Sequence, residues 1–102
     1  MEKVYYLITG EGRMSFEFDE AKSAANKRKH GIDFIEAQQL WADENRIQLR
    51  ARSVDEDRFM VIGMIGERHR TAFITLRGER IRMISVRCAR KREVSMYGRA
   101  DS

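Results

Sequence analysis

The chain has 102 residues, which is enough for one small domain and too few for two. Its charged fraction of 35% and hydrophobic fraction of 42% fit a folded globular protein rather than a disordered one. A single cysteine, Cys88, excludes an internal disulfide framework, and together with two histidines it is too few for a structural zinc site. The first residues lack a basic start followed by a long apolar block. We therefore expect a cytoplasmic protein with no membrane partner and no bound metal.

The positive charge is concentrated in the second half of the chain. Residues 46–102 contain 14 Lys and Arg against seven Asp and Glu, whereas residues 1–45 contain six against nine. All but one of those 14 cations are arginines, which bind phosphate bidentately and stack on bases. This half therefore suits a polyanionic partner. A solvent-exposed sheet with salt-bridged arginines would have the same composition, so charge alone leaves both interpretations open.

The beginning of the chain contains an apolar run, Val4 to Ile8, that ends in a Gly-Glu-Gly break. This pattern is compatible with an extra strand or with an extension outside the domain, so residues 1–14 are an N-terminal extension of uncertain structure. Residues 15–102 form the single predicted domain. Alternating residues in Ser15–Phe18 predict its first strand.

Two helices are predicted next. Asp19 has the character of an N-cap, and Gly31 stands where a glycine would end the helix that Asp19 opens. Asp33 and Glu36 match a capping box, and the apolar residues that follow fall on one face of a second helix over 33–42.

The second half changes to a strand pattern. Four strands are expected at 46–52, 58–65, 70–77 and 81–88, followed by a short helix at 89–97. A polar turn at Ser53–Asp57 and two glycine turns connect the strands and imply an antiparallel meander. The predicted fold is therefore α+β, with two N-terminal helices packed on one face of an antiparallel sheet and a short C-terminal helix. Its order is β-α-α-β-β-β-β-α.

Strict alternation in the last two strands separates two faces. The face expected under the helices carries Ala72, Ile74, Leu76, Ile84, Val86 and Cys88, with Arg82 at its edge. The other face carries Thr71, Phe73, Thr75, Arg77, Ile81, Met83, Ser85 and Arg87. Its mixture of arginines, hydroxyls and one aromatic ring fits a surface that binds phosphates and stacks a base. Simple exposure to solvent, or cover by a partner, would explain the same pattern.

Several ordered segments resemble the BrnT family of toxins from bacterial type II toxin–antitoxin modules. They are Phe16–Lys22, Asn26, Lys29–Phe34, Glu36–Ala37, Asp57–Gly63, Arg82–Ala89, and the pair Glu93 and Tyr97. Cys88 stands where the family usually has arginine. The resemblance implies a RelE-like fold and a metal-independent ribonuclease that needs no cofactor and arrests translation. It also implies a ribbon-helix-helix antitoxin as partner, with operator DNA bound only through that antitoxin.

The chemistry of such a ribonuclease indicates which residues to consider. Cleavage by 2′-hydroxyl attack requires cations that stabilise the charge on the phosphorane. Permanently charged arginines suit that task, and Arg58, Arg82 and Arg87 are the catalytic candidates. Candidates for RNA binding are Lys29, Phe73, Arg77 and Arg90.

A proton acceptor or donor is also required, and His30 and Tyr97 are its main candidates. Each has a structural alternative, because His30 can cap a helix end and Tyr97 can pin the last helix to the core. His69, Glu56 and Glu93 are further candidates, although a solvated histidine and glutamates paired with arginines would explain them equally well. Cys88 is expected to be a small core residue.

Three functions fit these observations. The first is a toxin ribonuclease. The second is a non-catalytic nucleic-acid-binding module, or a decayed toxin that acts only through its partner. The third is an interaction protein whose basic sheet docks an acidic partner. The first two both predict binding that weakens steeply with salt, but only the first predicts cleaved RNA.

Overall fold

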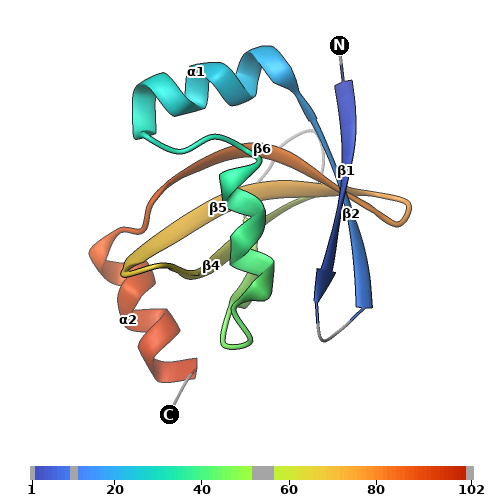
Figure 1. Ribbon diagram of the computed structural model, residues 1–102. Helices are drawn as coiled ribbons and strands as arrows, with labels where there is room; N and C mark the ends of the chain where they lie inside the picture. Colours follow the sequence, from blue (N-terminus) through green and yellow to red (C-terminus); the bar gives the residue numbers. More distant parts are fainter. Residues whose placement is uncertain (1, 10–11, 52–56, 101–102) are drawn as a thin grey trace.

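The computed structural model describes residues 2–9, 12–51 and 57–100, which form one six-stranded sheet with helices on both faces (Figure 1). The elements in chain order are β1 (Glu2–Thr9), β2 (Gly12–Asp19), α1 (Glu20–His30), the 3-10 helix η1 (Glu36–Ala42), β3 (Ile47–Ala51), β4 (Arg58–Ile65), β5 (Arg68–Arg77), β6 (Arg80–Cys88) and α2 (Lys91–Ala100). Most of the turn expected at Ser53–Asp57, including Glu56, lies outside the described residues. None of the helices in the described ranges is long and apolar enough to cross a membrane.

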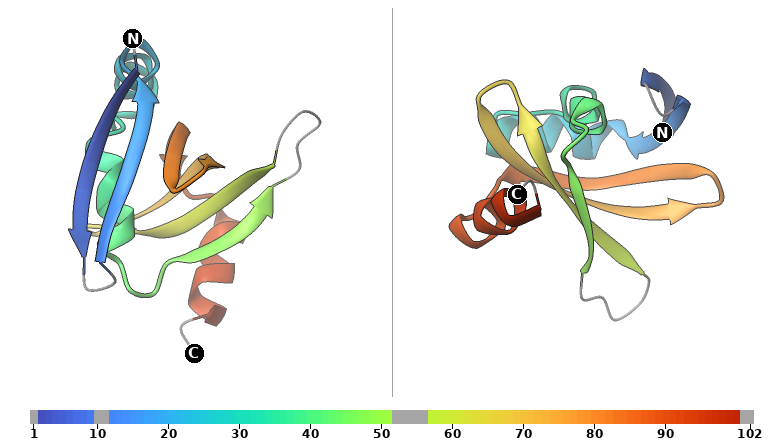
Figure 2. Two further views of the ribbon diagram at one scale, coloured as in Figure 1. Left: turned by 90° about the vertical axis from the view of Figure 1, so that its right-hand side faces the viewer. Right: turned by 90° about the horizontal axis from the view of Figure 1, so that it is seen from below.

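The sheet has the strand order β1-β2-β6-β5-β4-β3. Strands β3 to β6 form the antiparallel meander that the sequence predicts. The predicted order is wrong at the start, because β1 precedes the first expected strand and pairs with β2 along its whole length. β2 then joins β6 in parallel through three residue pairs. Figure 2 shows α1 and η1 on one side of the meander and α2 on the other.

The helix α1 begins and ends where its caps predict. The Asp19 carboxylate accepts hydrogen bonds from the backbone N–H groups of Ala21 and Lys22. Gly31 ends the helix with φ of 77°, in the left-handed region that favours glycine. A buried amide ties the helix to the sheet, because Asn26 donates to the Ile32 and Val86 carbonyls and accepts from the Val86 N–H.

The second predicted helix is a 3-10 helix, not an α-helix. Its capping box forms, since Asp33 Oδ1 accepts from the Ile35 and Glu36 N–H groups while the Asp33 N–H donates to Glu36 Oε1. Side chains three residues apart align in a 3-10 helix, so Ala37 and Leu40 point together into the core. Burial of Ala37 and Leu40 against the sheet, rather than helix propensity, therefore stabilises this short helix.

The core lies between the sheet and the pair α1 and η1. Its buried residues are Phe16, Phe18, Ile32, Phe34, Ala37, Leu40, Trp41, Val61, Ala72, Ile74, Met83 and Val86. Phe16 packs edge-on against Trp41, and Phe18 packs edge-on against Phe34. The β2 side chains thereby connect the N-terminal hairpin to the same core.

A β-bulge in β6 corrects the predicted division of the sheet faces. The register passes from the pair Phe73–Ser85 to the pair Ile74–Met83, so Ile84 has no partner across the ladder. An extra residue reverses the alternation beyond it. Met83 is therefore buried in the core instead of lying on the opposite face, and Arg82 moves onto that opposite face.

Three further expectations for the faces are also wrong. Ile81 packs against the core, although it was expected on the opposite face. Leu76 and Cys88 were expected in the core, but Leu76 is 50% exposed near the end of β5 and Cys88 is exposed at the end of β6. Strand ends extend past the covering helices, so alternation there does not imply burial.

Candidate functional site

The face of the sheet that carries α2, here called the α2 face, contains a row of charged and hydroxyl side chains. Thr75 pairs across the ladder with Arg82, and Arg82 pairs with Glu17 of β2. The β4–β5 register places Arg58 beside Thr75 on its other side. These four residues, Arg58, Thr75, Arg82 and Glu17, are called the arginine row.

The arginine row is partly shielded from solvent. Arg82 Nη1 lies 3.7 Å from Glu17 Oε2, and the two side chains are only 16% and 8% exposed. Thr75 is 3% exposed, and its hydroxyl has no hydrogen-bond partner among the described residues. Two guanidinium groups beside a buried hydroxyl provide donors for a phosphate group.

A second cationic group, Arg87, is held by a bidentate ion pair with Glu93 of α2. Arg87 Nη1 and Nη2 each lie 2.8 Å from a Glu93 carboxylate oxygen. Glu93 also accepts hydrogen bonds from the Thr71 hydroxyl at 2.7 Å and from the Arg90 N–H at 2.8 Å. The hydrogen bonds from Arg87, Thr71 and the Arg90 N–H therefore all stabilise the ionised form of Glu93.

These contacts change the titration of both partners. The bond from Arg87, helped by Arg90 and Thr71 and opposed by burial, lowers the pKa of Glu93 from 4.5 to about 2. The same bond from Glu93 raises the pKa of Arg87. A carboxylate with so low a pKa is a poor proton acceptor near neutral pH. Glu93 therefore acts as a positioning residue for Arg87.

Phe73 lies between Arg87 and the arginine row. It pairs with Ser85 of β6 and with Met60 of β4, and the Arg87 guanidinium carbon is 5.1 Å from its ring centre. Successive rows on one face are about 7 Å apart. Phe73 also lines an open hollow of about 520 Å³ together with Arg90. A base stacked on this ring would thus have cations on both sides.

The remaining RNA-binding candidates lie farther out. Arg77 is exposed at the end of β5, on the same face as Thr75 by alternation. Lys29 is exposed near the end of α1, on the opposite side of the sheet. The structure therefore gathers Arg58, Arg82, Arg87 and Phe73, with Arg90 and Arg77 at the margins.

The structure does not bring His30 to this group. His30 ends α1, and its carbonyl accepts a hydrogen bond from Arg70 at 3.5 Å. Arg70 pairs with Cys88 on the face that α1 covers. The backbone of His30 therefore lies on the side of the sheet opposite Arg87.

Tyr97 also lies apart from the arginine row. Its hydroxyl donates to Asp43 Oδ2 at 2.8 Å, and its ring packs edge-on against His69. Burial is the largest influence on the pKa of Asp43 and raises it, but bonds from the Met64 and Asn45 N–H groups and from Tyr97 together lower it. His69 precedes Thr75 by six residues on β5, or about 20 Å along the strand. Tyr97 thus connects α2 to the loop after η1.

Glu17 is the site residue that the sequence prediction missed. Its neighbours Phe16 and Phe18 are buried in the core, so alternation alone places Glu17 on the opposite face. That signal was available in the sequence. The contact with Arg82 was not, because it depends on parallel pairing between two strands more than 60 residues apart.

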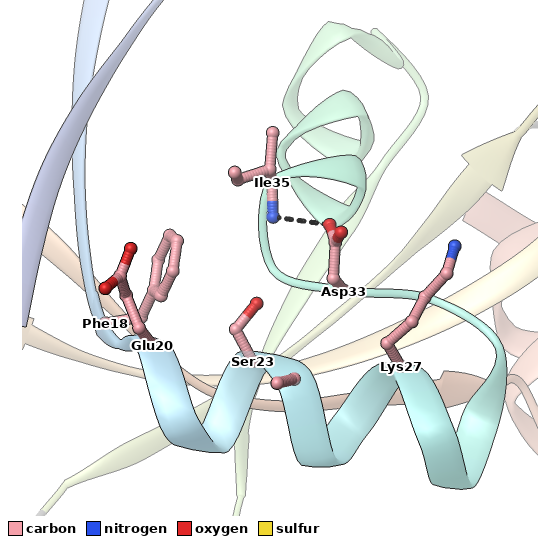
Figure 3. A pocket seen from close by; sticks show the side chains of 7 residues that line it. Phe18, Glu20, Ser23, Lys27, Asp33 and Ile35 are labelled. Atoms are coloured by element: carbon pink, nitrogen blue, oxygen red, sulfur yellow. Dashed lines mark hydrogen bonds between the residues drawn. The ribbon is translucent and has the colours of Figure 1, made fainter.

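A second hollow, of about 330 Å³, lies on the other side of the sheet between α1 and the loop before η1 (Figure 3). Its polar groups are engaged in helix ends. The Ser23 hydroxyl accepts from the Phe34 N–H, Asp33 caps η1, and Lys27 pairs with Glu36 at 2.6 Å. Because these polar groups bond to other groups of the fold, the α2 face is the stronger candidate for the functional site. Within the described ranges, no three His, Cys, Asp or Glu side chains gather as a metal ion would require.

The chain is also similar to a known protein family. Residues 18–93 match the family model described as the ribonuclease toxin, BrnT, of type II toxin–antitoxin systems. This range covers more than half of the chain and includes Arg58, Arg82, Arg87 and Glu93, but it ends before Tyr97. The comparison with curated proteins finds no match.

Proposed function

The chain belongs to the BrnT family of ribonuclease toxins of type II toxin–antitoxin systems, and we propose that it cleaves RNA on its α2 face, with the scissile phosphate at the arginine row. One observation carries this placement. Arg58 and Arg82 flank Thr75, a buried residue whose hydroxyl has no hydrogen-bond partner among the described residues. A buried donor without a partner is costly for stability alone, and a phosphate oxygen would satisfy it.

The proposed reaction needs no metal. The RNA 2′-hydroxyl gives its proton to solvent water as its oxygen attacks the adjacent phosphorus. The bond to the 5′-oxygen breaks, that oxygen takes up a proton from solvent, and a 2′,3′-cyclic phosphate and a 5′-hydroxyl end remain. The phosphorane carries additional negative charge, which the guanidinium groups of Arg58 and Arg82 stabilise. Glu17 holds Arg82 in place from its far side.

The neighbouring residues bind the substrate in this scheme. Phe73 offers its ring to a base, a contact worth about 1–3 kcal/mol. Arg87, fixed by Glu93, contacts the next phosphate, and Arg77 and Arg90 bind the strand at the margins. His30, Lys29 and Tyr97 are not included, because they lie on the other face or near the far end of β5.

The resemblance supports further parts of the proposal. We infer a RelE-like arrangement, cytoplasmic cleavage that arrests translation, and neutralisation by a ribbon-helix-helix antitoxin through which operator DNA is bound. These statements rest on the family and not on the geometry of the α2 face.

The sharpest test is Thr75→Val, which removes the hydroxyl and keeps the shape. Because that hydroxyl has no partner among the residues that the structure describes, we expect unchanged or higher stability in urea denaturation, together with at least an about tenfold loss of RNA cleavage. Arg82→Lys keeps the charge but loses the fork geometry, and it should lose activity similarly. Arg28→Lys, on the exposed surface of α1, is the matched control and should cleave normally.

The assay is induced expression in a bacterial host with mapping of new RNA ends, followed by cleavage with purified protein in the presence of a chelator. Full activity in both Thr75→Val and Arg82→Lys would refute the placement at the arginine row. RNA binding by the wild type without new ends would favour the non-catalytic binding module instead. Loss of cleavage in the chelator would refute the metal-independent reaction.

A further inference from the structure

A continuous groove runs between α2 and the edge strand β3. It consists of two adjoining hollows, of about 520 and 480 Å³, which share Leu49 and Met96 as lining residues. β3 is the last strand of the sheet, so no further strand of the described chain closes the groove on that side. The two views in Figure 2 show β3 and α2 as neighbours at this margin of the sheet. This feature is called the α2–β3 groove.

The floor of the groove is apolar. Ile47 and Leu49 of β3, Met60 of β4 and Met96 of α2 line it, and all four are only partly buried. Apolar side chains that stay partly exposed in a concave surface gain free energy when a partner covers them. Methionine side chains also adapt their shape to a partner.

The rim of the groove is cationic. Arg90 and Arg92 line its first hollow, and Arg99 lines the second. Arg90 and Arg92 are exposed, and neither guanidinium has an ion-pair partner in the part of the chain that the structure describes. Of the described residues that line the two hollows, only Glu93 carries a carboxylate, and that carboxylate is already bound to Arg87. The rim therefore complements negative charge.

An apolar floor with a cationic rim matches a protein segment better than it matches RNA. RNA phosphates would satisfy the arginines and a base would stack on Phe73, but the residues that line the second hollow include no aromatic ring for a further base. Ribose and phosphate there would leave Leu49 and Met96 without apolar contacts. An acidic segment that carries apolar side chains would satisfy both parts of the groove.

We propose that the α2–β3 groove binds an acidic protein segment with apolar anchors, supplied by the antitoxin partner that the family implies. This inference rests on the proposed function, because the first hollow also contains Phe73 and Arg90. A segment in the groove covers the stacking surface for RNA while leaving the arginine row itself in place. Neutralisation is then a competition for Phe73 and Arg90.

The experiment measures two quantities in each variant, the affinity for the co-expressed antitoxin and the rate of RNA cleavage by the free toxin. Arg92→Glu reverses a rim charge at the start of α2, where an acidic residue favours the helix. It should weaken antitoxin binding at least about tenfold and leave cleavage by the free protein unchanged. Arg28→Glu makes the same charge change on α1 and should alter neither quantity.

A second variant keeps the inference testable without a charge change. Leu49→Ser removes an apolar anchor point from the floor and should also weaken antitoxin binding at least about tenfold. Wild-type affinity in both groove variants would overturn the inference while leaving the proposed ribonuclease intact. Reduced cleavage in Arg92→Glu with normal antitoxin binding would assign the groove to RNA and equally overturn it. A wild-type protein that binds antitoxin in the groove but never cleaves RNA would instead refute the proposed function alone.

Discussion

Replacing Glu93 with glutamine removes one negative charge from the pair with Arg87 and preserves the shape of the side chain. In the folded protein Arg87, Thr71 and the Arg90 N–H all donate to this carboxylate. Its pKa is lowered from 4.5 to about 2, chiefly by the bond from Arg87. Protonation of Glu93 should therefore contribute to the dependence of stability on pH.

The magnitude follows from the shift. Each pKa unit corresponds to about 1.4 kcal/mol, so ionised Glu93 stabilises the fold by about 3 kcal/mol at neutral pH. Because the folded pKa lies below the unfolded one, this contribution is fully present above pH 4.5 and is lost as the pH falls through 2. At pH 3 about 1.5 kcal/mol should remain.

Urea denaturation of wild type and Glu93→Gln at pH 6, 5, 4 and 3 measures this contribution directly. The free-energy difference between them should shrink by about 1.5–2 kcal/mol from pH 6 to pH 3. Glu67→Gln, at an exposed turn, is the matched control and should follow the wild type at every pH. Parallel curves for wild type and Glu93→Gln would refute the reasoning, because the carboxylate would then have the same pKa in both states.

Two further predictions concern residues that hold the fold. Tyr97→Phe removes the hydrogen bond to Asp43, which keeps its hydrogen bond from the Met64 N–H. The free energy of unfolding should therefore fall by about 1–2 kcal/mol, with cleavage per folded molecule unchanged. A loss of cleavage without a loss of stability would show that Tyr97 is catalytic. Asn26→Ala leaves the Val86 N–H unpaired in the core and should lower stability by about 3 kcal/mol. Asn45→Ala, in an exposed turn, provides the comparison, and an equal effect there would contradict the bridging role of Asn26.

The candidate site was predictable as far as its arginines. Charge in the second half of the chain points to Arg58, Arg82 and Arg87 as candidates, but alternation in the last strands places only Arg87 on the α2 face. The sequence prediction also listed His30 and Tyr97, because a histidine at a helix end and a tyrosine in a late helix have side chains suited to proton transfer. Their positions relative to the arginine row depend on which face each element covers, and that is a property of the packed molecule.

Interactions between residues that are close in the chain explain which features the sequence by itself determined. The N-cap at Asp19, the left-handed glycine at Gly31 and the apolar run of β4 depend on neighbouring residues, so they can be predicted from the printed order of residues. The antiparallel meander follows equally from short turns between strands.

Only the tertiary structure decided the rest. The bulge at Ile84 moves Arg82 onto the α2 face because burying Met83 against the core is favourable, and no local pattern records that gain. The parallel joint between β2 and β6 brings Glu17 to Arg82 across more than 60 residues. Local propensity fixes helix ends and turns, whereas long-range pairing depends on the free energy of a whole packed core, which no short segment contains.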